Sequence, residues 1–162
     1  LQELAAEVVA ARFDAAVFSS PSTFHRLLEA REAARVLVAF LRESVETGRP
    51  AAGPVCLLAG GETTVTVRGP GQGGRNQELA VAASEALIGF PAPAVVASFG
   101  TDGIDGVSDA AGGVVDDQTT ARAAALGLAP PGGRCLTPLT PAIQSRRSAA
   151  SGYVHLLGHR RQ

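Results

Sequence analysis

The feature that most constrains the fold of this chain is an alternation of helical and strand patterns along its first 127 residues. Apolar residues at every third or fourth position predict amphipathic helices, and short apolar or β-branched runs predict strands. Alternation of this kind favours an α/β fold, in which a layered sheet is flanked by helices. The predicted helices are residues 1–12, 29–47, 75–89 and 116–127, and the predicted strands are residues 14–19, 54–61, 62–69 and 94–100.

The sequence after residue 129 differs from the rest. All 15 acidic residues lie at or before Asp117, and the tail is rich in Pro, Ser and Arg without a helical or strand period. We therefore divide the chain into a domain over residues 1–129 and an irregular tail over residues 130–162. The abrupt loss of acidic residues also raises the hypothesis of a shifted reading frame, which sequencing the gene across the codons for residues 127–135 would test.

The overall composition excludes several classes of protein. The formal net charge is −1, which gives no basis for a nucleic-acid or membrane partner through bulk electrostatics. No apolar run has the length of a transmembrane helix, and no signal peptide is recognisable. The two cysteines, Cys56 and Cys135, make neither a disulfide framework nor a metal site by spacing. We expect a soluble, cytoplasmic protein, and the start at Leu1 indicates a piece of a longer gene product.

A glycine-rich loop lies between a predicted strand and a predicted helix. Gly69, Gly71 and Gly74 form a G-x-G-x-x-G string, and Gly73 precedes the last of them. Glycines allow an anion to approach the backbone closely, and the N-terminus of the following helix offers unpaired amides. The loop therefore predicts a phosphate site. The alternative is a flexible connection that binds no ligand.

This loop fits neither of two common nucleotide-binding patterns well. A Walker A loop requires a lysine, and the chain contains none. A dinucleotide fingerprint requires an acidic residue about 20 positions further on, whereas the first acid after the next strand is Asp102. Arg68 and Arg75 also flank the loop. NAD binding therefore has less support than phosphate binding.

Arg75 opens the predicted helix, where the helix dipole disfavours a cation unless a negative group is near. A bound anion would meet this condition, and so would a salt bridge to Glu62 or Glu78. Asn76 can cap the helix or donate to a ligand. Glu62 is either a strand-edge residue or the residue that positions Arg75.

Three aspartates, Asp102, Asp105 and Asp109, follow the strand at 94–100. The carboxyl edge of an α/β sheet is where ligands bind, and clustered carboxylates there indicate a divalent cation such as Mg²⁺. One of these aspartates can instead accept a proton from a substrate hydroxyl. The alternative is that aspartates beside glycines simply form turns.

Two segments together resemble the class II glycerate kinases: LLAGGETTVTVRGPGQGGRNQELA at 57–80 and SFGTDGIDGVSDAAGGVVDD at 98–117. In that family these segments belong to the C-terminal domain known as MOFRL, and members also carry the name hydroxypyruvate reductase. The resemblance covers residues 29–129. It ends before the Asn-Asp-Ser and TGPTGTN-like segments with which the family would continue.

The resemblance implies transfer of a phosphoryl group from ATP, with Mg²⁺, to the 2-hydroxyl of D-glycerate, which gives 2-phosphoglycerate. It places the reaction between a Rossmann-like N-terminal domain, which this chain lacks, and the present domain. We therefore expect the isolated chain to be inactive. An NAD(P)H-linked hydroxypyruvate reductase and a non-catalytic remnant are the alternatives. The predicted site residues are Arg75, Asp102 and Asp105 for catalysis, Gly69, Gly71, Gly73, Gly74, Asn76 and Glu62 for cofactor binding, and Asp102 and Asp105 for the metal.

Overall fold

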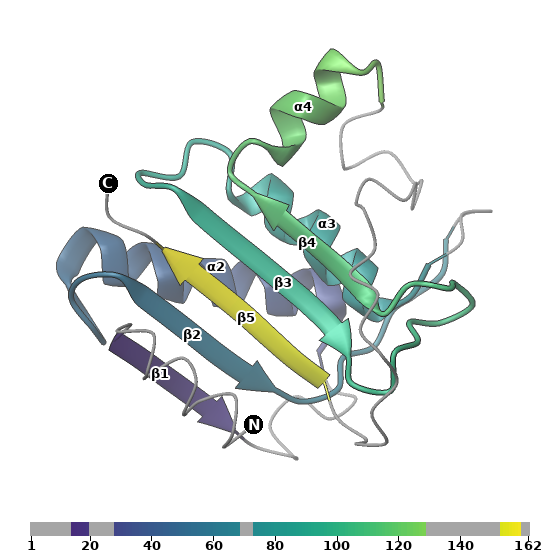
Figure 1. Ribbon diagram of the computed structural model, residues 1–162, viewed down its shortest axis with the longest axis horizontal. Coiled ribbons are helices and arrows are strands. Elements are labelled where there is room, and N and C mark those ends of the chain that lie inside the picture. Colours follow the sequence, from purple (N-terminus) through teal and green to yellow (C-terminus); the bar gives the residue numbers. More distant parts are fainter. Residues whose placement is uncertain (1–13, 20–27, 69–72, 129–152, 160–162) are drawn as a thin grey trace.

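The computed structural model describes residues 14–19, 28–68, 73–128 and 153–159 (Figure 1). Within these residues the strands form one mixed sheet of order β1-β2-β5-β3-β4. The predicted combination of a layered sheet and helices is confirmed. The strands are β1 (Asp14–Ser19), β2 (Val55–Gly60), β3 (Ala94–Gly100), β4 (Gly112–Asp116) and β5 (Tyr153–His159), and the helices are α2 (Ala30–Thr47), α3 (Arg75–Ala86) and α4 (Thr119–Ala125).

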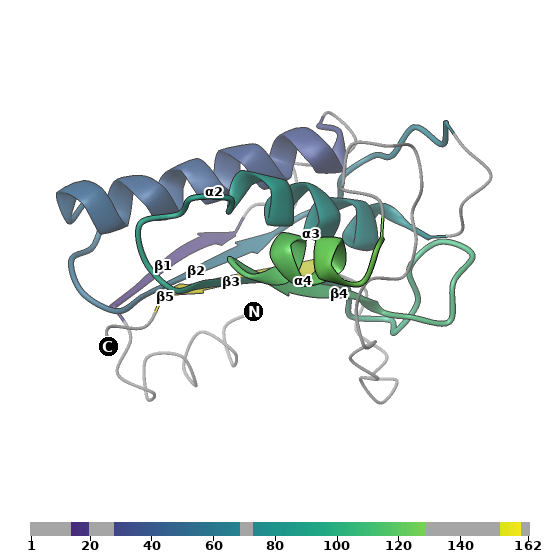
Figure 2. The same ribbon diagram turned by 90° about the horizontal axis from the view of Figure 1, so that it is seen from above.

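Two helices cover one face of the sheet. α2 and α3 lie side by side over the strands, and α4 lies beside α3 near β4 (Figure 2). None of the helices in the described segments is both long and apolar enough to cross a membrane. The core between the helices and the sheet consists of alanines and branched aliphatic side chains, among them Ala34, Leu41, Leu57, Leu79, Ala83 and Val96.

The helix predicted at 29–47 is α2, and its sequence explains both its face and its end. Leu37 and Leu41 are buried one turn apart, as the helical period of apolar residues requires. Gly48 adopts φ 74°, and its backbone N–H donates to the carbonyl of Ser44. A left-handed residue at this position is the usual way to close a helix, and glycine adopts it without steric cost.

The directions of the strands place two connecting segments at the same end of the sheet. β5 runs antiparallel to both β2 and β3, so β2 and β3 run parallel to one another. The segments after β2 (residues 61–68) and after β3 (residues 101–111) consequently leave the sheet at the same end, as both views show (Figures 1 and 2). This end of the sheet holds the candidate site.

The prediction of an irregular tail is wrong for Tyr153–His159, which forms β5 in the centre of the sheet. Leu157 of this strand is opposite Leu57 on one side and Val96 on the other. A strand of seven residues offers too few positions for a clear period, and its state is decided by the pairing partners on both sides. Residues 130–152 and the predicted helix at 1–12 lie outside the described residues, so those predictions and the reading-frame hypothesis remain untested.

The strand predicted at 62–69 is absent from the sheet. Residues 62–68 make only an isolated parallel bridge, in which Thr64 pairs with Glu29 at the start of α2. The backbone N–H of Ala30 donates to the carbonyl of Thr64 at 2.8 Å. The β-branched residues of this segment favour extended backbone, but β1 and β5 already occupy both sides of β2.

Strand β4 was not predicted, because its sequence begins with two glycines. A Cβ atom at Gly112 would overlap the carbonyl oxygen of Ser98 in the neighbouring strand β3. Glycine here permits close approach of two backbones, which is one of its functions inside strands. The helix predicted at 116–127 is confirmed in its central part, as α4.

Candidate functional site

The glycine loop and the aspartate loop meet at the start of α3. A Cβ atom at Gly74 would overlap Oδ1 of Asp105, and one at Gly106 would lie 2.5 Å from the carbonyl oxygen of Gly73. Gly106 also has φ 63°, which disfavours other residues. These glycines therefore allow one loop to pack against the other. Gly69 and Gly71 lie outside the described residues.

The carboxylate of Asp105 caps α3. It accepts hydrogen bonds from the backbone N–H groups of Asn76, at 3.0 Å, and Gln77, at 2.8 Å. The N-cap residue, Gly74, has no side chain to do this. Asp105 is only 1% exposed, and its negative charge lies at the positive end of the helix dipole. Two of the amides that were expected to meet a phosphate thus already donate to a carboxylate of the protein.

Asn76 continues this network into the sheet. Its side-chain Nδ2 donates to Oδ1 of Asp105 at 3.0 Å, and its Oδ1 accepts from the hydroxyl of Ser98 at 2.7 Å. Asn76 is 2% exposed and Ser98 is fully buried. The side chain of Asn76 therefore links β3, α3 and the aspartate loop. Sequence reasoning missed Ser98, whose only signal is its place in the segment SFGTDG.

Arg75 forms an ion pair with Glu62, in which Nη1 and Oε1 are 2.6 Å apart. The side chains are 31% and 22% exposed, so the pair lies at the surface of the site. The second partner considered for Arg75, Glu78, pairs instead with Arg31 of α2 at 2.8 Å. Glu62 therefore acts as the residue that positions Arg75.

Asp102 is exposed, and its Oδ1 accepts from the backbone N–H of Ile104 at 3.2 Å. This is the turn-forming role that an aspartate beside a glycine was expected to allow. In the segments that the structure describes, no three His, Cys, Asp or Glu side chains lie close enough together to hold a metal ion. The metal-binding role of Asp102 and Asp105 stays a prediction.

A second polar cluster fixes α3 against α2. Arg31 donates through Nε and Nη2 to Glu78, at 3.0 and 2.8 Å, and through Nη1 to Glu85 at 3.4 Å. Burial lowers the pKa of Arg31, but the hydrogen bond and the charges of the glutamates raise it further, so that the net shift is upward. The guanidinium stays charged between the helices and holds α3 in place behind the site.

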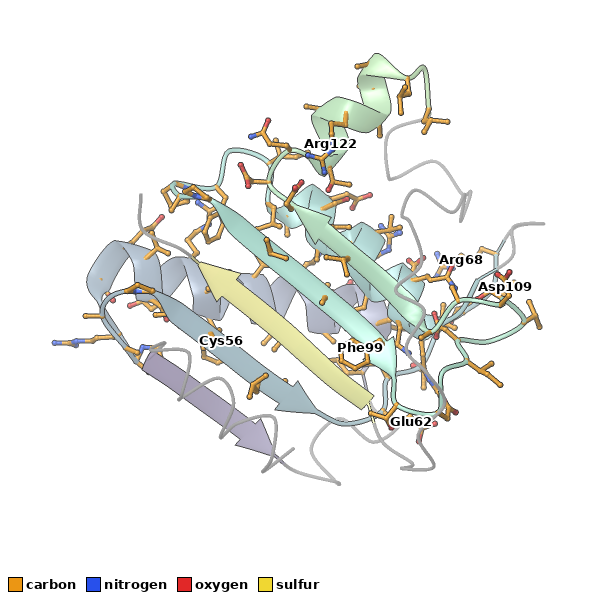
Figure 3. The ribbon with its side chains drawn as sticks, in the orientation of Figure 1. Cys56, Glu62, Arg68, Phe99, Asp109 and Arg122 are labelled. Atoms are coloured by element: carbon orange, nitrogen blue, oxygen red, sulfur yellow. The ribbon has the colours of Figure 1, made fainter. Side chains whose placement is uncertain are left out.

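Figure 3 shows which labelled side chains share the loop end of the sheet. Glu62, Arg68, Phe99 and Asp109 lie at this end, whereas Cys56 lies within β2 and Arg122 on α4. Cys56 is buried, and burial raises the pKa of its thiol to about 11. A thiol that stays protonated at neutral pH is a poor nucleophile, so Cys56 has a packing role.

Several known proteins are similar to this chain in sequence. The D-glycerate 2-kinase of Thermotoga maritima is 48% identical over 102 residues, which cover 63% of this chain and 24% of the relative. The glycerate 2-kinase of Pyrococcus horikoshii is 46% identical over 92 residues, covering 56% and 20%, and the glycerate kinase of Homo sapiens is 48% identical over 91 residues, covering 54% and 17%. The chain thus spans about a quarter or less of these relatives.

Two solved structures are similar to the present one. The crystal structure of glycerate kinase from Thermotoga maritima has a TM-score of 0.81 and 33% identity, over 95% of this chain and 38% of that chain. A crystal structure of a Pyrococcus horikoshii protein has a TM-score of 0.84 and 27% identity, over 99% and 38%. Residues 55–135, which include both loops of the site, match the model of the MOFRL family. The chain belongs to the MOFRL family.

Proposed function

We propose that this chain is the C-terminal region of a glycerate kinase, which transfers a phosphoryl group from ATP to D-glycerate and gives 2-phosphoglycerate. The observation that supports this most directly is that Arg75 stands on a helix start clamped between the glycine loop and the aspartate loop. The named relatives support the same reaction class. Because the chain spans only a small part of those relatives, we propose that activity requires the rest of such an enzyme.

Arg75 is the residue we propose to contact the substrate or the phosphates. Its side chain is 31% exposed and its guanidinium lies 2.6 Å from Glu62, so it is already oriented before a ligand binds. A phosphate or the glycerate carboxylate would share the guanidinium with Glu62, because the planar fork of an arginine can bind an anion through two parallel N–H groups. Phosphoryl transfer depends mainly on positioning and on neutralising charge, which an oriented arginine supplies.

The nucleotide phosphates would approach the glycine loop through Gly69, Gly71 and Gly73, because the amides of Asn76 and Gln77 already donate to Asp105. Two exposed carboxylates lie at this end of the sheet, those of Asp102 and Asp109, and we propose Asp102 as the metal ligand. Mg²⁺ in phosphoryl transfer is held by one or two carboxylates together with phosphate oxygens, so an exposed aspartate such as Asp102 fits this use. When bound, Mg²⁺ neutralises phosphate charge.

We also propose a cytoplasmic location, supported by the free, buried Cys56.

The test is to fuse the N-terminal region of the Thermotoga maritima D-glycerate 2-kinase, the part that this chain does not match, to the full chain. Fusion removes weak association as a cause of inactivity. With ATP, Mg²⁺ and D-glycerate we expect 2-phosphoglycerate from the fusion and none from the chain alone.

Two variants complete the test. Arg75→Gln should lower kcat/KM by about 100-fold or more, since it removes a charge that stabilises the transition state. Arg122→Gln is the matched control, because this arginine lies on α4, away from the loop end (Figure 3), and should leave activity unchanged. A fusion that makes no 2-phosphoglycerate would contradict the proposal. NADH oxidation with hydroxypyruvate would favour the reductase instead.

A further inference from the structure

We infer that Asp105 is the positioning residue of this site: its buried carboxylate fixes the first turn of α3 and thereby sets where Arg75 points. The catalytic consequence of this inference rests on the proposed function, whereas the positional part concerns the chain alone. It gives Asp105 a different role from the metal ligand or base that its place in the sequence predicted.

The hydrogen bonds of Asp105 act directly on the backbone that carries Arg75. The N–H of Asn76, which donates to Asp105 at 3.0 Å, belongs to the same planar peptide unit as the carbonyl of Arg75. Fixing this plane fixes the Cα atom from which the guanidinium extends. The neighbouring bond from Gln77 N, at 2.8 Å, holds the next peptide plane to the same carboxylate.

The carboxylate has no space in which to move. A Cβ atom at Gly74 would overlap Oδ1 of Asp105 and would lie 2.5 Å from its carbonyl carbon. The side chain of Asn76 also donates to Oδ1 and is itself held by Ser98 of β3. Hydrogen bonds through Ser98, Asn76 and Asp105 therefore fix the position of Arg75 relative to the sheet.

The chemistry of these bonds requires a carboxylate. The Asp105 carboxylate accepts from three donors: two backbone N–H groups and the amide Nδ2 of Asn76. An asparagine has the same size but only one acceptor atom, so its own NH₂ group would face one of these donors. Asp105→Asn is consequently a change of hydrogen bonding with little change of shape.

The first experiment uses the chain alone and follows the Nε–H signal of Arg75 by NMR. We expect Asp105→Asn to shift this signal and to speed amide hydrogen exchange at residues 76 and 77 by about 10-fold, the effect of losing a typical hydrogen bond to a charged group. Asp117→Asn is the matched control, because Asp117 also accepts a backbone N–H, from Ala94 at 3.3 Å, at the opposite end of β3. It should leave the Arg75 signal unchanged.

An Arg75 signal that stays in place in Asp105→Asn would overturn the inference. If this variant does not fold, Ser98→Ala takes its place, since it removes the hydroxyl that holds Asn76 and leaves the carboxylate. Ser98→Ala should shift the Arg75 signal in the same direction by a smaller amount. An unshifted signal in Ser98→Ala would likewise overturn the inference.

The second experiment is a double-mutant cycle on kcat/KM in the fused enzyme. Asp105→Asn should lower kcat/KM by about 100-fold, the typical cost of misplacing a catalytic group by an ångström. If Asp105 acts through Arg75, the same change should cost far less when Arg75 is already glutamine. Equal losses in both backgrounds would overturn the catalytic part. An inactive wild-type fusion would count against the proposed function alone, and the NMR result would still decide the positional part.

Discussion

An aspartate lies beside the N-terminus of α3 and another beside that of α4, but the two differ in sequence distance, burial and hydrogen-bond partners. Asp105 lies 29 residues from Asn76 in the sequence, is almost completely buried and accepts from α3 backbone amides. Asp116 stands just before α4 in the sequence, is 34% exposed, and accepts from Thr119, Arg122 and the N–H of Gln118. The local contacts of Asp116 stay within the start of α4, whereas the distant cap Asp105 joins two loops into a single unit.

The largest expected effect comes from filling the contact between those loops. Gly74→Ala would place a methyl group against the Asp105 carboxylate, so either the cap or the loop must shift. We expect the free energy of unfolding, measured with urea, to fall by about 3 kcal/mol. Gly89→Ala is the control, because Gly89 has φ 66° and nothing within 4 Å, and should cost only about 1 kcal/mol for the backbone conformation. Equal losses of unfolding free energy in the two variants would show that the contact between Gly74 and Asp105 adds nothing to stability.

A direct comparison of the two aspartates should give the next largest effect. Asp105→Asn leaves at least one buried N–H group without an acceptor, which costs about 2 kcal/mol of unfolding free energy. Asp116→Asn removes an exposed pair and should cost less than about 1 kcal/mol. Both free energies come from the same urea titration. If the two substitutions destabilise the chain equally, burial does not make the contribution of Asp105 to stability larger than that of Asp116.

The smallest effect concerns pH. Burial raises the pKa of Asp116, but hydrogen bonds from Arg122, Thr119 and the N–H of Gln118, together with the charge of Arg122, lower it further, so the net shift is downward. A carboxyl with a lowered pKa stabilises the folded state above its unfolded pKa, near 3.9, and loses this contribution as the pH falls through the folded value.

The wild type should therefore exceed Asp116→Asn in unfolding free energy by less than about 1 kcal/mol at pH 5–6, and this difference should vanish towards pH 2. Urea titrations of both proteins across this range measure it. A difference that persists at pH 2 would mean that the charge of Asp116 is not the source of the stabilisation.

Local patterns predicted the parts of the fold that depend on local interactions. The period of apolar residues in α2 and the glycine that closes it are both visible in consecutive residues. The strand β5 was missed, because its place between β2 and β3 depends on partners that are distant in the sequence. The β-branched pattern at 62–69 predicts a strand, but residues 62–68 stay outside the sheet because β1 and β5, which are distant in the sequence, occupy both sides of β2.

In the candidate site, too, local patterns predicted mainly the features that depend on nearby residues. The sequence correctly placed Arg75 at the start of a helix and offered Glu62 as one of its partners, a pairing that the structure confirms at 2.6 Å. The sequence could not distinguish Asp102 from Asp105, because each immediately precedes a glycine in the same loop. Only the folded arrangement turns one carboxylate towards α3 and leaves the other exposed.

The central place of β5 has a consequence for how the chain is made. In the described residues, β1 pairs with β2 and β3 pairs with β4, and the two pairs are joined through β5. Until the ribosome has delivered residues 153–159, each pair therefore presents an unsatisfied strand edge to the cell, and such edges recruit other chains. The arrival of residues 153–159 is thus the step that joins the two pairs and covers these edges.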